Sequence, residues 1–200
     1  QKQVDGLIVV PSTAAVHDHL SPTSRRNIPL VVIDRMVPGV NATSITTNDF
    51  ESCDASVKEA VAKGHKNLSF LIATSTIEGF DSEKPVLRNT TIEDRVNGFM
   101  NGVIDTKAKK AQWIFCSENP QTAEDAVNHL LDSKNPPSVI FTSNNDMALA
   151  VLKVAGKRGL ILGQDISLVT VDDSQWLEAI SPGITVVERP VDEVARLAVE

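Results

Sequence analysis

Polar and charged residues follow almost every apolar run of this 200-residue chain. The residues in these places are Ser12, Asp34, Arg35, Thr74, Ser117, Glu118, Asn144, Asp172 and Asp173, with Arg95 one turn inside a helix. Carboxylates, amides and a guanidinium can hydrogen-bond a polar small molecule from several sides, and a buried polar group left without a partner costs about 1–3 kcal/mol. Single Asn and Asp residues after strands are also ordinary caps and turn formers, so only their convergence on one edge indicates a binding site.

The stretch 138–173 indicates how the chain positions such groups. Apolar runs at 139–141 and 166–171 predict two strands, and the residues between them recur with a helical period. The members of that helical face are Met147, Ala150, Val151, Val154 and Ala155. A strand, a helix and a strand in so short a span form a βαβ unit, whose parallel strands end at one edge. Ligands bind at that edge of an open sheet, so we expect Asn144 and Asp172 to face one crevice.

The rest of the chain repeats this alternation of strands and helices. The further expected strands are 7–10, 30–33, 68–72, 113–115 and 184–187. The further expected helices are 13–26, 50–63, 91–104, 122–132 and one starting at 191. Residues 45–47 are expected to be a short extended connection and 73–89 a loop with an insertion. Strands and helices that alternate over short connections predict an α/β fold with parallel sheet.

Composition excludes several classes of protein. A hydrophobic fraction of 42% supports a folded core, and a net charge of −7 without basic clusters argues against direct binding to a nucleic-acid backbone. No apolar run has the length of a membrane span, so we expect no membrane partner. Cys53 and Cys116 are expected to be buried thiols rather than a disulfide or a metal site, which fits a cytoplasmic protein.

Motifs of the common enzyme classes are missing from the sequence. There is no GxGxxG after a strand, no GxxxxGKS/T, no GxSxG and no HExxH. His17 and His19 point to different faces of the expected helix, which argues against a metal site there. The pair Asp172 and Asp173 is explained by one ligand-facing carboxylate and one cap. We therefore expect no catalytic residue, no metal and no cofactor.

Several segments resemble, in order, the motifs of the LacI/GalR family of transcriptional regulators. Residues 141–150 resemble its "ND-x-MA" segment, and 163–173 look like its "G-x-D-(I/V)-S-(L/V)-V-G-(F/Y)-D-D" segment. Residues 181–190 are similar to its crossover "P-x-L-T-T-(V/I)-x-Q-(P/D)". Further matches in order are Val4–Ile8, Pro29–Asp34, Gly64–Lys66 and Arg95–Phe99. The resemblance therefore spans the whole chain.

The resemblance implies a type I periplasmic-binding-protein-like fold of two Rossmann-like subdomains with parallel sheets. Residues 1–47 would belong to the N-terminal subdomain, 48–186 would form the C-terminal subdomain, and 187–200 would return to the first. The chain is expected to be incomplete at both ends of this fold, because its first residues lead straight into a strand without an initiator Met.

In this family the effector lies in the cleft between the subdomains. The resemblance implies that the cleft residues of this chain are Asp34, Thr91, Arg95, Glu118, Asn144 and Asp172. Arg95 would clamp a pair of hydroxyls or a carboxylate, and Asp172 would accept from sugar hydroxyls or ring N–H groups. Glu118 stands where the family often has an aromatic residue, which weakens stacking and suits an effector with an amine or many hydroxyls.

The leading hypothesis is therefore the effector-sensing and dimerisation core of a bacterial transcriptional regulator. A homodimer would bind operator DNA through a headpiece that this chain lacks, and the effector would be sugar-like. The main alternative is a periplasmic sugar-binding protein of an ABC transporter, which shares the fold. A sugar-metabolising α/β enzyme is a third, more distant hypothesis, motivated by the acidic cleft. A helix-turn-helix before this segment would favour the first hypothesis, and a signal peptide the second.

Overall fold

A six-stranded sheet forms the centre of the larger part of the protein. The computed structural model describes residues 4–11, 20, 28–37, 39–87, 89–181 and 183–200. The strands lie in the order β5–β6–β4–β7–β8–β9, all parallel except β5, which pairs antiparallel with β6. Their bounds are β4 Asn67–Ala73, β5 Phe80–Asp81, β6 Lys110–Cys116, β7 Val139–Thr142, β8 Ser167–Val171 and β9 Thr185–Val187. The expected α/β fold with parallel sheet is thus confirmed.

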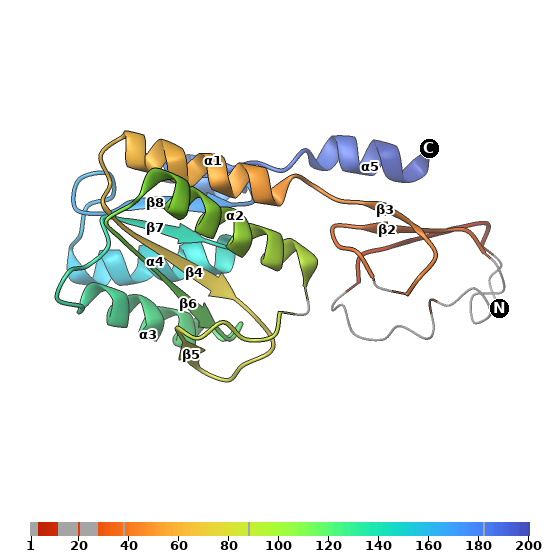
Figure 1. The fold of residues 1–200 in the computed structure, drawn as a ribbon. Coiled ribbons are helices and arrows are strands. Elements are labelled where there is room, and N and C mark those ends of the chain that lie inside the picture. The colour runs from red at the N-terminus through yellow and green to blue at the C-terminus, as the bar shows by residue number, and fades with distance from the viewer. Residues whose placement is uncertain (1–3, 12–19, 21–27, 38, 88, 182) are drawn as a thin grey trace.

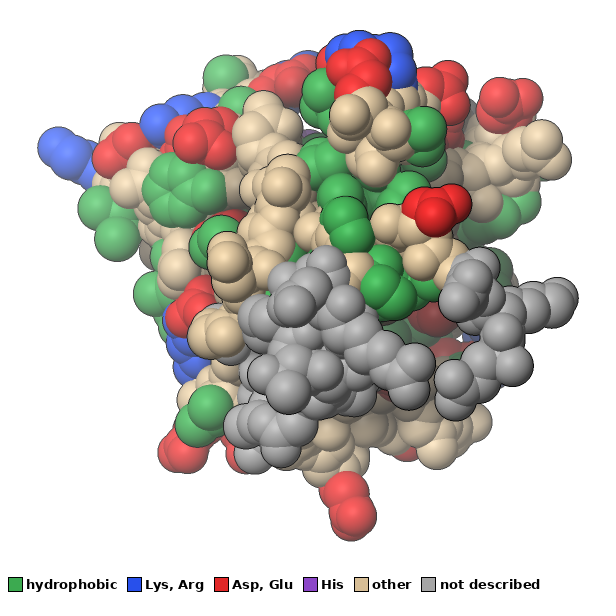
Figure 2. All heavy atoms as spheres, turned by 90° about the vertical axis from the view of Figure 1, so that its right-hand side faces the viewer, with side chains coloured by type: hydrophobic (Ala, Val, Ile, Leu, Met, Phe, Trp, Pro, Cys, Tyr) green, Lys and Arg blue, Asp and Glu red, His purple; other side chains and the backbone are tan. Residues whose placement is uncertain are grey.

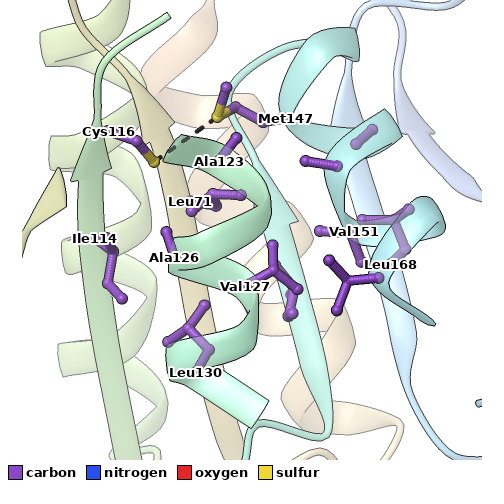
Figure 3. Packing of buried hydrophobic residues seen from close by; sticks show 14 of the residues in the cluster. Leu71, Ile114, Cys116, Ala123, Ala126, Val127, Leu130, Met147, Val151 and Leu168 are labelled. Carbon is purple, nitrogen blue, oxygen red and sulfur yellow. Dashed lines mark hydrogen bonds between the residues drawn. The ribbon is translucent and has the colours of Figure 1, made fainter. Parts of the chain in front are cut away.

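Two pairs of helices cover the two faces of this sheet (Figure 1). They are α1 Asp49–Ala62 and α2 Thr90–Thr106 on one face, and α3 Pro120–Leu131 and α4 Asn145–Arg158 on the other. Successive side chains of a strand point to opposite faces. In β4, accordingly, Phe70 and Ile72 pack in the core under α1 and α2, and Leu71 packs in the core with α3 and α4. Figure 3 shows the second core, where Val127 of α3 and Val151 of α4 point toward the sheet.

A smaller unit lies at one end of the larger one (Figure 1). It contains a parallel three-stranded sheet and the last helix, which contacts β2 and β3. The bounds are β1 Leu7–Val9, β2 Leu30–Ile33, β3 Thr43–Ile45 and α5 Val191–Val199. Apolar side chains reach the surface at this end (Figure 2), among them Ile8, Val10, Leu197 and Val199. Two chain segments join the units, one between β3 and α1 and one between β9 and α5.

Most expected elements form within a few residues of where the sequence places them. Three differ or cannot be compared. Ile45, expected to begin the connection 45–47, is instead the last residue of strand β3, which pairs with β2, and the expected loop 73–89 contains the short strand β5. The expected helix 13–26 falls almost entirely outside the described residues. A short 3-10 helix at Gln175–Ala179 follows β8. Among the described helices, none combines the length and apolarity needed to cross a membrane.

Helices α1 and α2 approach each other closely because α2 carries glycines at the contact. A Cβ atom added at Gly98 would lie 2.2 Å from the carbonyl oxygen of Phe50, and one at Gly102 would lie 2.7 Å from Cβ of Val57. Backbone atoms cannot yield as a flexible side chain can, so the interhelical distance depends on Gly98.

We predict that Gly98→Ala lowers the free energy of unfolding by about 1–3 kcal/mol or more, because the methyl group collides with the backbone of α1. Gly156→Ala is the matched control: Gly156 lies in α4 with nothing within 4 Å of an added Cβ. There the substitution should stabilise by roughly 0.5–1 kcal/mol, since Ala favours helix more than Gly does. Urea titration of both variants measures the difference, and equal effects at the two positions would contradict this account of the packing.

Candidate functional site

A cleft of about 380 Å³ lies between the carboxyl ends of the two sheets. The small sheet contributes residues after β1 and β2, and the large sheet contributes residues after β4, β6, β7 and β8. In the large sheet the chain runs from β4 to β6 on one side and then to β7 on the other, so the direction of winding reverses at β4. Ligands bind at such a switch point in open α/β sheets, and the cleft has the volume of a small-molecule site.

The structure brings all six predicted site residues to this cleft. Asp34, Thr91, Arg95, Glu118, Asn144 and Asp172 line it together. Of the other polar residues at strand ends, Arg35 and Thr74 also line the cleft, whereas Asp173 lines an adjoining surface hollow. Ser12 lies outside the described residues. That the six residues bind a ligand remains a prediction.

Arg95 is held by a buried ion pair. Its Nε donates to Oδ1 of Asp49 at 2.6 Å, and its Nη1 donates to the carbonyl of Ser143 at 2.6 Å. The two charged side chains are only 4% and 5% exposed. A guanidinium has five N–H groups, so three remain on the two terminal nitrogens. Arg95 is therefore fixed in orientation and can still donate to a ligand in the cleft.

Asp34 and Asp172 occupy equivalent places on the two walls. Each follows directly after its strand with a positive φ, 75° for Asp34 and 73° for Asp172. The backbone N–H of Asp34 donates to Ile45 at the end of β3, and that of Asp172 to Val187 at the end of β9. Non-glycine residues with positive φ are uncommon, although Asp is enriched among them, and such strain concentrates at functional sites. The same backbone conformation thus places one carboxylate on each wall of the cleft.

Arg189 connects these two carboxylates. Its Nε donates to Oδ1 of Asp172, and its Nη1 donates to Oδ1 of Asp34. Asp34 also accepts from Arg35 through Oδ2. Thr91 adds a further tie between the walls, because its hydroxyl donates to the backbone carbonyl of Asp34 at 2.5 Å. The cleft walls are therefore linked through side chains as well as through the two chain segments.

Asn144 and Glu118 complete the set of predicted residues. Asn144 caps α4, since its Oδ1 accepts from the N–H of Met147 at 3.0 Å, and it lines the cleft as well. The ordinary capping role and the predicted cleft position are thus compatible. Glu118 is exposed at the rim and forms no ion pair within the described part of the chain. The part of the lining that the structure describes contains no aromatic side chain.

Asp49 and Arg189 are the residues that sequence reasoning missed. Asp49, in the first turn of α1, is buried and holds Arg95. Arg189 lies in the segment 181–190 that resembles a family motif, but the sequence does not predict it as a site residue. The rule that polar groups follow strands could have found Arg189, since it comes two residues after β9. No comparable signal identifies Asp49, because its partner lies 46 residues away.

The two cysteines lie outside the cleft lining, and both are poor nucleophiles. Burial raises the pKa of the Cys53 thiol to about 12, with Arg95 lowering it by less, and burial likewise raises the pKa of Cys116 to about 12. Both cysteines are free, as expected. Across the described residues there is no group of three His, Cys, Asp or Glu side chains that could hold a metal ion. The arrangement is suited to hydrogen bonding.

Comparison with known proteins points to one family. Residues 57–200 match the periplasmic binding protein-like domain. The chain is 27% identical over 198 residues to the Bacillus subtilis (strain 168) protein named "Probable HTH-type transcriptional repressor ExuR", covering 98% of this chain and 56% of that protein. It is also 27% identical over 201 residues to the HTH-type transcriptional repressor PurR of Proteus mirabilis (strain HI4320), covering 99% and 55%. The chain thus spans about half the length of these relatives.

Solved structures show the same fold. A LacI family transcriptional regulator from Enterococcus faecium with bound ribose superposes with a TM-score of 0.80 at 18% identity, covering 98% of this chain and 68% of that one. A LacI family transcriptional regulator from Corynebacterium glutamicum superposes with a TM-score of 0.81 at 19% identity, covering 98% and 59%. At such identities the likeness concerns the fold.

We predict that Asp49→Ala lowers the free energy of unfolding by about 3–5 kcal/mol, because it leaves the Arg95 charge buried without its partner. Glu59→Ala, which breaks the exposed pair between Glu59 and Lys63 on the same helix, is the control and should have almost no effect. Denaturant titration compares the two variants. A loss below about 1 kcal/mol for Asp49→Ala would show that the buried pair does not anchor the fold.

We also predict that Cys53 and Cys116 resist alkylation by iodoacetamide at pH 8. A pKa of about 12 leaves each thiol protonated there, and both are buried away from the reagent. Mass spectrometry should find both cysteines unlabelled in the native protein and labelled in urea. Rapid labelling of either cysteine without denaturant contradicts the prediction.

Proposed function

The chain belongs to the periplasmic binding protein-like domain family as an effector-binding domain of the LacI type, and on this premise we propose that its cleft binds a sugar-like, hydroxyl-rich effector. The observation that carries the proposal is the convergence of donors and acceptors from both sheets on one cleft of small-molecule size. Arg95 supplies N–H donors, and Asp34 and Asp172 supply carboxylate acceptors. A sugar presents hydroxyls that both donate and accept around a compact ring, and so it matches this mixture.

A purine effector is the second candidate. The PurR repressor of Proteus mirabilis is similar over nearly the whole chain, which favours it. A flat base binds most strongly where an aromatic side chain can stack on it, however, and the described lining offers none. The Enterococcus faecium regulator of the same fold holds ribose. These points together favour the sugar over the purine.

The proposed mechanism uses the two connecting segments as hinges. Residues 1–47 and 187–200 would move as one subdomain and 48–186 as the other, with the effector touching both. An effector that contacts both walls favours the arrangement in which both contacts are made, and so it shifts the equilibrium between arrangements. This shift is the signal that a sensor transmits.

In the proposed setting the chain is part of a homodimeric regulator whose separate headpiece binds operator DNA in the cytoplasm. The curated relatives, about twice as long as the region they share with this chain, are repressors, which supports this setting. No catalysis is proposed. A periplasmic sugar-binding protein remains the alternative, and a helix-turn-helix or a signal peptide in the full-length gene decides between the two.

We predict that Asp172→Asn weakens binding of the effector by about 1–3 kcal/mol, because a carboxylate acceptor facing the ligand is lost. Asn tolerates the positive φ of this position, so the backbone should remain in place. A thermal-shift screen of the intact protein against sugars, polyols, sugar phosphates and nucleobases identifies the ligand, since binding raises the melting temperature. Calorimetry then measures the affinity of each variant.

Asp173→Asn is the matched control. Asp173 is the next residue, it is exposed, and it lies outside the cleft lining, so its substitution should leave affinity unchanged. Equal affinity of wild-type protein and Asp172→Asn for the identified ligand would refute the proposed site. If nucleobases alone raise the melting temperature of the protein, a purine takes the place of the sugar as the proposed effector.

A further inference from the structure

Arg189 joins the two walls of the cleft at a single point. It lies in the segment between β9 and α5, and its guanidinium donates to one carboxylate from each wall, Asp34 after β2 and Asp172 after β8. Burial by itself lowers the pKa of Arg189, but the charges and hydrogen bonds of Asp172 and Asp34 outweigh it and raise the pKa above its ordinary value. The guanidinium is therefore charged.

The charges around the cleft cancel in groups. Arg189 and Arg35 together neutralise Asp172 and Asp34. Arg95 is neutralised separately by Asp49 behind it. The carboxylate oxygens of the two aspartates keep lone pairs for hydroxyl donors, but they carry no uncompensated charge.

An acidic hollow lies on the other side of Arg189. It shares Asp172 and Arg189 with the cleft, and its other charged lining residues are Asp173, Glu188, Asp192 and Glu193. Arg189 is thus the cation between the cleft and four further carboxylates. Because Asp34 would keep its pair with Arg35, removal of Arg189 would leave one uncompensated carboxylate in the cleft, that of Asp172, and would open the cleft to that negative field.

We infer that Arg189 determines the charge class of the effector and restricts the cleft to uncharged, hydroxyl-rich molecules. The inference rests on the proposed function and adds the ligand's charge to it. An ammonium group beside Asp34 or Asp172 would meet a tethered guanidinium that already occupies the carboxylate. An anionic group would find the guanidinium groups of the cleft already paired with carboxylates, and it would meet the rim carboxylate of Glu118, which forms no ion pair among the described residues. A neutral hydroxyl can use the remaining lone pairs without either penalty.

The test uses matched sugars that differ in charge. Intact full-length protein is titrated in a calorimeter with glucose, galactose and mannose, and with the 2-amino and uronate derivative of each. Wild-type protein should bind the best neutral hexose at least about tenfold more tightly than its charged derivatives. Arg189→Gln should weaken binding of the neutral hexose and shift the ratio of amino-sugar to neutral-sugar affinity by about tenfold or more toward the amino sugar.

Two further variants separate charge from structural damage. Arg189→Lys keeps the positive charge and should preserve the wild-type order of preference. Arg158→Gln removes an arginine that pairs with Asp132 between α3 and α4, and it should change nothing. General loss of structure lowers the affinity for all three sugars of a set together, so it cannot produce the shift in ratio.

Each remaining outcome is decisive. A wild-type preference for the amino sugar or the uronate overturns the inference while leaving a sugar sensor in place. If Arg189→Gln leaves the ratio of amino-sugar to neutral-sugar affinity unchanged, the inference is also overturned while the sugar sensor stands. If no sugar of the panel binds to wild-type protein, the proposed hexose-like effector fails, and the inference fails with it.

Discussion

The buried ion pair between Arg95 and Asp49 is the constraint on which the site depends. It joins the start of α1, the first turns of α2 and, through the carbonyl of Ser143, the end of β7. Replacing a buried ion pair with apolar residues often costs nothing in stability, so stability alone does not explain its presence. The pair does place a guanidinium with three unused N–H groups at the edge of the sheet where a ligand would bind. We therefore regard it as an anchor that orients the cleft.

The two walls of the cleft are built by the same backbone arrangement. Asp34 and Asp172 each follow a strand in the left-handed region and each lie beside the strand that leads into a connecting segment. This arrangement puts one carboxylate on each side of the cleft and the guanidinium of Arg189 between them. Under the proposed function, a ligand that replaces or supplements these contacts would act on both subdomains at once. The proposal therefore couples binding to subdomain arrangement without any need for a long pathway through the fold.

The sequence predicted the cleft better than it predicted how the cleft is held together. Alternating strands and helices gave the parallel sheet, and a parallel sheet brings the carboxyl ends of its strands to one edge, so Asn144, Glu118 and Asp172 could be placed together. Asp49 could not be assigned to the site from the sequence. A carboxylate in the first turn of a helix is explained by its favourable interaction with the helix dipole, and nothing in the sequence indicates its distant partner. Strand β3 was missed because its three residues, with two polar members, carry no apolar run, and the strand is defined by its pairing with β2.

A crystal structure of the full-length protein with its tightest-binding sugar tests the central claim most directly. The account predicts that the sugar lies in the cleft and that its hydroxyls are within hydrogen-bonding distance of Arg95 and Asp172 on one wall and of Asp34 on the other. A sugar bound outside the cleft, or held by residues of one wall alone, would contradict it.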